Sequence, residues 1–175
     1  PALSDIVIAG HSGGGQVVQR YAVVTRGEAA VALRGIAVRY VIANPSSYVY
    51  FDALRPTASG EFKTFDAAVC RQFNDWKYGL VDLPAYVREG RGPLASAELE
   101  AAYVKRDVVV LLGGDECDPM HPALDRSCAA RAQGEHRLGR GRAYARYMAM
   151  GHPAGLNHRT VEIANVGHDA HGIFT

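Results

Sequence analysis

Short apolar runs recur along the chain, each bounded by glycine, proline or charged residues, and this pattern predicts β-strands. The first and third runs are almost continuously apolar, which is typical of parallel strands covered on both faces. The predicted strands are Ile6–Gly10, Ile36–Pro45, Asp107–Gly114 and Thr160–Val166.

Stretches with apolar residues at helical spacing lie between these runs. They predict helices at Gly14–Thr25, Ala95–Lys105 and Arg140–Met150. The alternation of strands and helices indicates an α/β fold, in which helices flank a parallel sheet and the crossovers are right-handed. The apolar face expected for the first helix consists of Val17, Val18, Tyr21 and Val24.

The stretch Ser46–Pro93 interrupts the alternation and is rich in aromatic residues, proline and glycine. A stretch of this length is predicted to be an insertion rather than a simple connection. Its aromatic side chains are expected either to form a small core of the insertion or to line an acyl or aromatic pocket. They are Tyr48, Tyr50, Phe51, Phe62, Phe65, Phe73, Trp76, Tyr78 and Tyr86.

Composition is that of an ordinary globular protein and suggests one domain. The chain has 175 residues, of which 48% are hydrophobic and 21% are charged, and its formal net charge is +1. This balance gives no electrostatic argument for binding nucleic acid or an anionic membrane. No run of about 20 apolar residues predicts a membrane span. Of the three cysteines, Cys117 and Cys128 either form a disulfide or remain thiols like Cys70, and their spacing is not that of a zinc site.

The sequence GHSGG at positions 10–14 fits the pattern G-x-S-x-G. A serine on a sharp turn between strand and helix has a strained backbone, so its neighbours must be small. We expect Gly10 and Gly14 to let strand and helix approach closely, and the Gly13 N–H to point at a developing oxyanion. Ser12 is therefore predicted to be a catalytic nucleophile rather than part of a structural turn. A phosphate-binding loop fits less well, because neither G-K-[ST] nor G-x-G-x-x-G is present.

A serine nucleophile of this kind needs an acid and then a histidine further along the chain. His168 follows the last predicted strand and is our first choice for the base, with His171 as its rival. Asp115, Glu116 and Asp118 follow the third strand. One of these carboxylates would accept the imidazole N–H and stabilise the imidazolium, and the spacing alone leaves all three open.

These motifs together resemble the α/β-hydrolase superfamily of serine hydrolases and esterases. "GHSGG" resembles its nucleophile elbow, "VVVLLGGDE" its acid-bearing strand 7 and "EIANVGHD" its histidine-bearing strand 8. The register of the superfamily implies Glu116 as the acid, although aspartate is commoner there. The resemblance also implies that residues 46–104 are a cap or lid between strands 6 and 7. "NPSSYVYFD", "NDWKYGL" and "LDRSCAARAQG" are similar to a poorly characterised group of bacterial and fungal hydrolase-like proteins.

The resemblance covers only the carboxyl-terminal half of the superfamily's fold. Strands 1 to 4 and a second oxyanion N–H would then belong to an amino-terminal half, which is the expected partner of this chain. Without it the first strand would be an uncovered edge. The chain starts at Pro1 rather than at a methionine, which we interpret as the loss of an upstream segment. The compartment therefore stays open, with secretion or a periplasmic location possible.

Two functions are compatible with the sequence. The first is a serine hydrolase that cleaves a carboxylic ester of a small acyl substrate through an acyl-enzyme, with no metal or organic cofactor. The second is a non-catalytic binding or interaction protein that has kept the fold.

Overall fold

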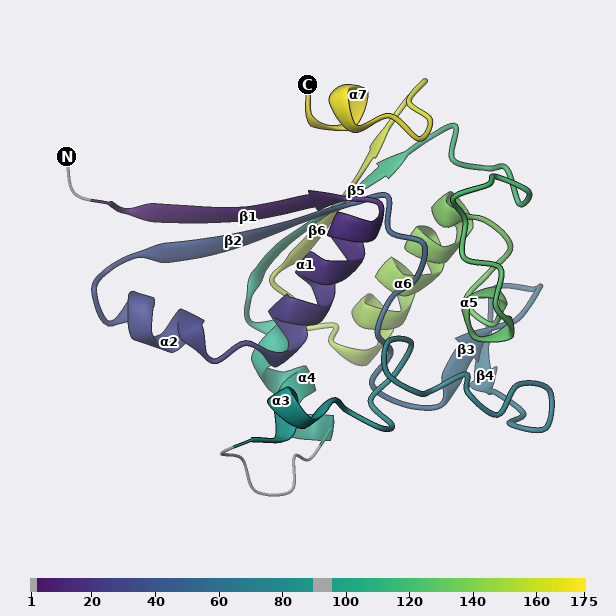
Figure 1. The fold of residues 1–175 in the computed structure, drawn as a ribbon, viewed down its shortest axis with the longest axis horizontal. Coiled ribbons are helices and arrows are strands. Elements are labelled where there is room, and N and C mark those ends of the chain that lie inside the picture. Colours follow the sequence, from purple (N-terminus) through teal and green to yellow (C-terminus); the bar gives the residue numbers. More distant parts are fainter. Residues whose placement is uncertain (1–2, 90–95) are drawn as a thin grey trace.

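The computed structural model describes residues 3–89 and 96–175, and these contain a sheet of four parallel strands (Figure 1). The order across the sheet is β1-β2-β5-β6, and each neighbouring pair is parallel. The strands are β1 (Asp5–His11), β2 (Ala37–Ala43), β5 (Asp107–Gly113) and β6 (His158–Ile163). The α/β fold and its four predicted strands are therefore confirmed, with shifts of a few residues at their ends.

Helices lie between the strands, as the alternation predicts. Helix α1 packs along β1 and β2, α6 packs on β5, and α4 packs against α1. The helices are α1 (Gly13–Val24), α2 (Gly27–Ala32), α3 (Ala85–Arg88), α4 (Ser96–Val104), α5 (Cys128–Arg131), α6 (Arg137–Gly151) and α7 (Ala170–Phe174). The start predicted for α4, Ala95, lies outside the described residues. Within the described ranges, no helix combines the length and the apolar character that crossing a membrane would require.

The buried face of α1 differs from the predicted one. Val18 is buried as expected, but Val17 is 67% exposed and Tyr21 is 44% exposed. Gly15 faces the sheet and allows a close approach, since a Cβ atom there would lie only 2.7 Å from the carbonyl oxygen of Ala43. This close packing rotates the predicted apolar stripe partly into solvent.

An irregular segment after β2, residues 44–51, is buried along its whole length. Because it belongs to no strand or helix, its peptide groups need side-chain partners. Gln133 pairs with both the N–H and the carbonyl of Tyr48, at 2.8 and 2.7 Å, and Gln19 accepts from Val49 N–H at 3.1 Å. Buried glutamines thus replace the ladder that a strand would provide.

The insertion continues with a short antiparallel hairpin, β3 (Leu54–Pro56) and β4 (Phe62–Thr64). Its aromatic residues do not form one separate core. Tyr48, Tyr50 and Phe51 join the main core of the sheet domain, whereas Phe73 belongs to a small second cluster. Trp76 and Tyr86 line a surface groove instead.

A disulfide joins the insertion to the segment after β5, between Cys70 and Cys128. The possible Cys117–Cys128 bridge is therefore wrong, and Cys117 is an exposed free thiol. Sequence spacing suggested the nearer pair. The fold instead brings Cys70 to Cys128 across 58 positions, because the small second cluster packs the insertion against α5.

Asp125 forms a second link to the insertion and should make stability sensitive to acid. Burial alone would raise the pKa of Asp125, but hydrogen bonds from Tyr78 and Ser127 and the Lys77 ammonium outweigh it and lower the pKa. The unfolded-state pKa is about 3.9, so the contribution to stability is complete above that value and is lost as the pH falls below it. We expect the unfolding free energy of Asp125→Asn to be about 1–3 kcal/mol lower than that of the wild type at pH 7. Between pH 5 and pH 3 the unfolding free energy of the variant should fall less than that of the wild type. Urea unfolding at pH 7, 5 and 3 measures these differences. An equal fall in unfolding free energy between pH 5 and pH 3 in the two proteins would contradict the prediction.

Candidate active site

Ser12 occupies the sharp turn between β1 and α1. Its backbone angles, φ 57° and ψ −117°, are ones that a residue other than glycine rarely adopts, at a cost of about 1–3 kcal/mol. A hydrogen bond from Ser12 N–H to the carbonyl of Ala43, 2.8 Å, holds the turn against the end of β2. The residue before Ser12 thus ends a strand and the residue after it begins a helix, as the motif predicts.

The glycines around Ser12 have separate uses. A Cβ atom at Gly10 would lie 2.4 Å from the backbone of Gly14, so Gly10 is required there. Gly14 itself has open space around its missing side chain, which contradicts the expectation that it must be glycine. The close approach of α1 to β2 falls on Gly15 instead.

Gly13 is the first residue of α1 and is exposed. The first N–H groups of a helix have no partner within it and carry its positive dipole end. The first turn of α1 contains no acidic residue that would cancel this potential. A carbonyl oxygen beside Ser12 would therefore meet an electropositive N–H donor.

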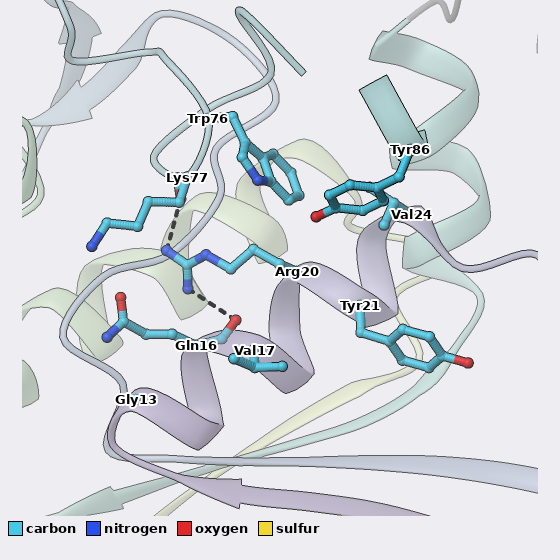
Figure 2. Close-up of a pocket in the computed structure, with 9 residues that line it drawn as sticks. All are labelled: Gly13, Gln16, Val17, Arg20, Tyr21, Val24, Trp76, Lys77 and Tyr86. Carbon is cyan, nitrogen blue, oxygen red and sulfur yellow. Dashed lines mark hydrogen bonds between the residues drawn. The ribbon is translucent and has the colours of Figure 1, made fainter. Parts of the chain in front are cut away.

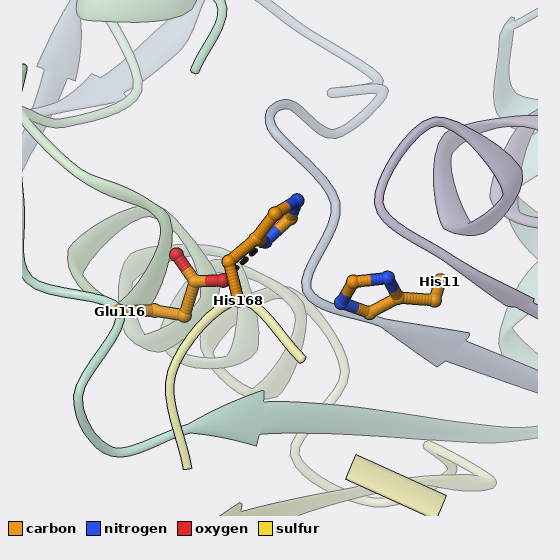
Figure 3. Close-up of side chains that lie close together, drawn as sticks. All are labelled: His11, Glu116 and His168. Carbon is orange, nitrogen blue, oxygen red and sulfur yellow. Dashed lines mark hydrogen bonds and ion pairs between the residues drawn. The ribbon is translucent and has the colours of Figure 1, made fainter. Parts of the chain in front are cut away.

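Glu116 and His168 come together at the carboxyl ends of β5 and β6. His168 Nδ1 and Glu116 Oε1 form a hydrogen bond (Figure 3). Glu116 is 4% exposed, and its other oxygen, Oε2, accepts from Arg137 at 3.2 Å. The arrangement matches what an acid must do to orient an imidazole.

The rival residues lie elsewhere. Asp115 and Asp118 are both exposed, and Asp118 accepts the N–H of Met120 in a local turn. His171 is exposed on the short helix α7. Of the three candidate carboxylates, Glu116 is thus the one whose carboxylate contacts His168 in the described structure.

Two further histidines, His11 and His121, flank His168 and were not predicted from the sequence as site residues. The ring of His11 lies 4.6 Å from that of His168, and the ring of His121 lies 4.8 Å from it in an edge-on contact. Burial lowers the pKa of the His11 imidazole, and the neighbouring His168 lowers it further. The position of His11 next to Ser12 was the available signal.

Asn44 is another residue that sequence reasoning missed. It is almost fully buried, with φ 44°, at the end of β2. Its amide accepts from Gly113 N–H at 2.8 Å and donates to the Gly167 carbonyl at 3.3 Å. Asn44 thereby ties the end of β5, which precedes Glu116, to the loop that carries His168. An asparagine near the carboxyl end of a predicted strand was its only signal.

The structure brings His11, the neighbour of Ser12, against His168. Among the described residues, however, no hydrogen bond reaches the Ser12 hydroxyl. Catalytic hydrogen bonds are often long in ligand-free structures and shorten when substrate binds.

His11, Glu116 and His168 are also a possible metal-binding group, because one ligand atom from each lies within 4.8 Å of the others. Two imidazoles and a carboxylate are ordinary zinc ligands. The positive guanidinium of Arg137 already neutralises Glu116, however, and His168 Nδ1 is paired with the same carboxylate. The contacts therefore favour an acid–base pair over a metal site.

A groove of about 460 Å³ runs along α1 from Gly13 to Val24 (Figure 2). One wall is the outward face of α1, and the other comes from Trp76, Lys77 and Tyr86 of the insertion. The groove therefore begins beside the N–H group that follows Ser12.

Two solved structures resemble this arrangement. One is a poly(aspartic acid) hydrolase-1 from Sphingomonas sp. KT-1, with a TM-score of 0.62, 25% identity, and coverage of 95% of this chain and 50% of that protein. The other is LpqC, a poly(3-hydroxybutyrate) depolymerase from Bordetella parapertussis, with a TM-score of 0.61, 22% identity, and coverage of 95% and 46%. The chain shares the α/β fold of two hydrolases.

The names of the two neighbours describe one as a hydrolase and the other as a depolymerase. The chain spans about half the length of each. No protein-family model matches it, and a search of curated proteins finds no match.

Proposed function

We propose that this chain carries the catalytic residues of a serine hydrolase that cleaves a carboxylic ester. The observation that carries the proposal is the contact of the buried Glu116 with His168 at the edge of the sheet where Ser12 occupies its strained turn. A strained serine after a strand, an oriented imidazole and a free helix N-terminus are the parts that acyl transfer needs.

In this mechanism Ser12 Oγ attacks the carbonyl carbon while His168 takes the hydroxyl proton. Glu116 stabilises the resulting imidazolium, and the Gly13 N–H donates to the oxyanion. His168 then gives its proton to the leaving alkoxide as the ester C–O bond breaks. Water attacks the acyl-enzyme, its proton passes to His168, and Ser12 leaves with that proton restored.

The groove along α1 supports an acyl substrate of small molecular size or one repeat of a chain. Its walls are largely apolar and it begins at Gly13. The two neighbours act on poly(aspartic acid) and poly(3-hydroxybutyrate), according to their names. We propose that residues 46–104 act as the cap that provides Trp76 and Tyr86 to this groove.

We further propose that the complete site includes an amino-terminal half of the fold that pairs with β1. Among the described strands, β1 has a neighbour on one side only; Val7 on it is 60% exposed, and Leu3, just before it, is 62% exposed. A parallel strand with an open edge and exposed apolar side chains needs cover. The same half would supply the second oxyanion donor.

A binding protein without activity is the alternative, and the unbonded Ser12 hydroxyl is the observation that favours it. On this alternative, the longer protein that contains both halves of the fold would be folded but would hydrolyse no ester.

Turnover of p-nitrophenyl esters of increasing acyl length tests the proposal, with this chain alone and with the longest natural chain that contains it. We expect activity in the longer chain, a loss of at least about 10³-fold in Ser12→Ala, and no loss in Ser59→Ala, an exposed serine of the β3–β4 turn. Equal rates in the Ser12→Ala variant and the wild type would contradict the assignment.

A further inference from the structure

Arg137 is the first residue of α6 and is 1% exposed. Its guanidinium contacts Glu116 and His121, and each of these residues contacts His168. One nitrogen, NH1, donates to Glu116 Oε2 at 3.2 Å and to His121 Nδ1 at 3.4 Å. The other terminal nitrogen donates to the carbonyl of Ala123.

We propose that Arg137 is the positioning residue of the Glu116–His168 pair, an inference that rests on the proposed function. It does not touch the reacting atoms. It holds one carboxylate oxygen so that the other faces His168, and it holds the ring of His121 edge-on against the imidazole.

The two carboxylate oxygens of Glu116 have different partners, which supports the claim that Arg137 directs the carboxylate toward His168. Glutamate has one more rotatable bond than aspartate, so a glutamate acid needs more restraint to keep a fixed direction. Oε2 is bound by Arg137, and Oε1 is bound by His168. The main chain of Glu116 is fixed by the same helix end, because Leu138 N–H donates to its carbonyl at 3.1 Å.

The hydrogen bonds of His121 support the claim that Arg137 holds the ring of His121 against His168. Its Nδ1 receives hydrogen bonds from Arg137 and from Ala123 N–H, at 3.4 and 3.2 Å. Since both partners donate, Nδ1 holds a lone pair and the ring proton lies on Nε2. Arg137 therefore fixes the ring that packs edge-on against His168.

Charge supports the same role. Glu116 is buried, and a buried carboxylate is strongly disfavoured unless a cation and hydrogen bonds compensate for its lost hydration. Arg137 provides both. By contrast Arg140, one turn along α6 and equally buried, donates only to carbonyl oxygens, those of Ser46, Asp125 and Gly134. Arg140 is thus a matched buried arginine with a structural role.

The test compares Arg137→Met and Arg137→Lys with Arg140→Met and the exposed Arg142→Met, in the wild type and in a Glu116→Gln background. We expect Arg137→Met to lower kcat roughly 10–100-fold with little change in KM, as for other groups that orient catalytic ligands. Arg137→Lys should recover part of kcat, because the ammonium keeps the charge but not the fork of donors. In the Glu116→Gln background the Arg137 effect on the rate of fluorophosphonate labelling should nearly vanish, since the arginine acts through Glu116.

Equal losses from Arg137→Met in both backgrounds, or the same kcat loss from Arg140→Met at matched stability, would overturn the inference. If Arg137→Met does not fold, Arg137→Lys in both backgrounds gives the same comparison. Failure of the proposed function looks different, because the wild type would then show neither turnover nor labelling.

Discussion

Glu116→Gln should reduce kcat by roughly 10³–10⁴-fold and leave KM within a few-fold. The substitution keeps the size of the side chain but removes its charge, so His168 Nδ1–H loses the anionic acceptor that fixes its tautomer and stabilises the imidazolium. Steady-state hydrolysis of the best p-nitrophenyl ester measures both parameters. The substitution leaves Arg137 buried without its anion, and urea unfolding of the same variant measures the resulting loss of stability.

The neighbouring carboxylates are the controls for this prediction. Asp115→Asn and Asp118→Asn change exposed residues of the same loop and should keep kcat within about two-fold. If Asp118→Asn lost activity and Glu116→Gln kept it, the acid would be assigned to the wrong residue.

Removal of the Cys70–Cys128 bridge should have the largest effect on stability. Closing a loop across 58 positions lowers the entropy of the unfolded chain, and the expected loss for the Cys70→Ala/Cys128→Ala variant is about 4 kcal/mol or somewhat less. Urea unfolding with and without dithiothreitol measures it. Dithiothreitol should destabilise the wild type and leave the double variant unchanged.

Cys117→Ala is the matched control, because Cys117 is exposed and unbridged. It should unfold like the wild type under both conditions. A destabilising effect of Cys117→Ala that disappears under reduction would instead indicate the nearer pair.

The long elements and the meeting of Glu116 with His168 could be predicted, because each element and each of these residues has a local signal. The strands are short apolar runs, and Ser12 is framed by glycines between a strand and a helix. Glu116 and His168 follow strands whose carboxyl ends meet at one edge of a parallel sheet. Spacing left Asp115 and Asp118 open, and Glu116 differs from them by its burial and by its contact with His168.

What the sequence could not predict depends on contacts between distant segments. The short helices α2, α3, α5 and α7 have four to six residues, too few for a clear periodic pattern. Asn44 and Arg137 act on Glu116 and His168 through tertiary contacts, and neither stands out in the sequence. The outward turn of Val17 follows from the packing of Gly15 against β2, which no pattern of hydrophobic residues records.

The central claim is that Ser12 is a nucleophile activated by the Glu116–His168 pair. Mass spectrometry of the tryptic peptide that ends at Arg20, after treatment of the natural full-length protein with a fluorophosphonate, tests it most directly. That peptide contains Ser4 and Ser12, and fragment ions distinguish them. The account predicts one adduct on Ser12, formed at least about 10²-fold more slowly in Glu116→Gln. A folded wild-type protein that stays unlabelled, or one that carries the adduct on another serine, would contradict it.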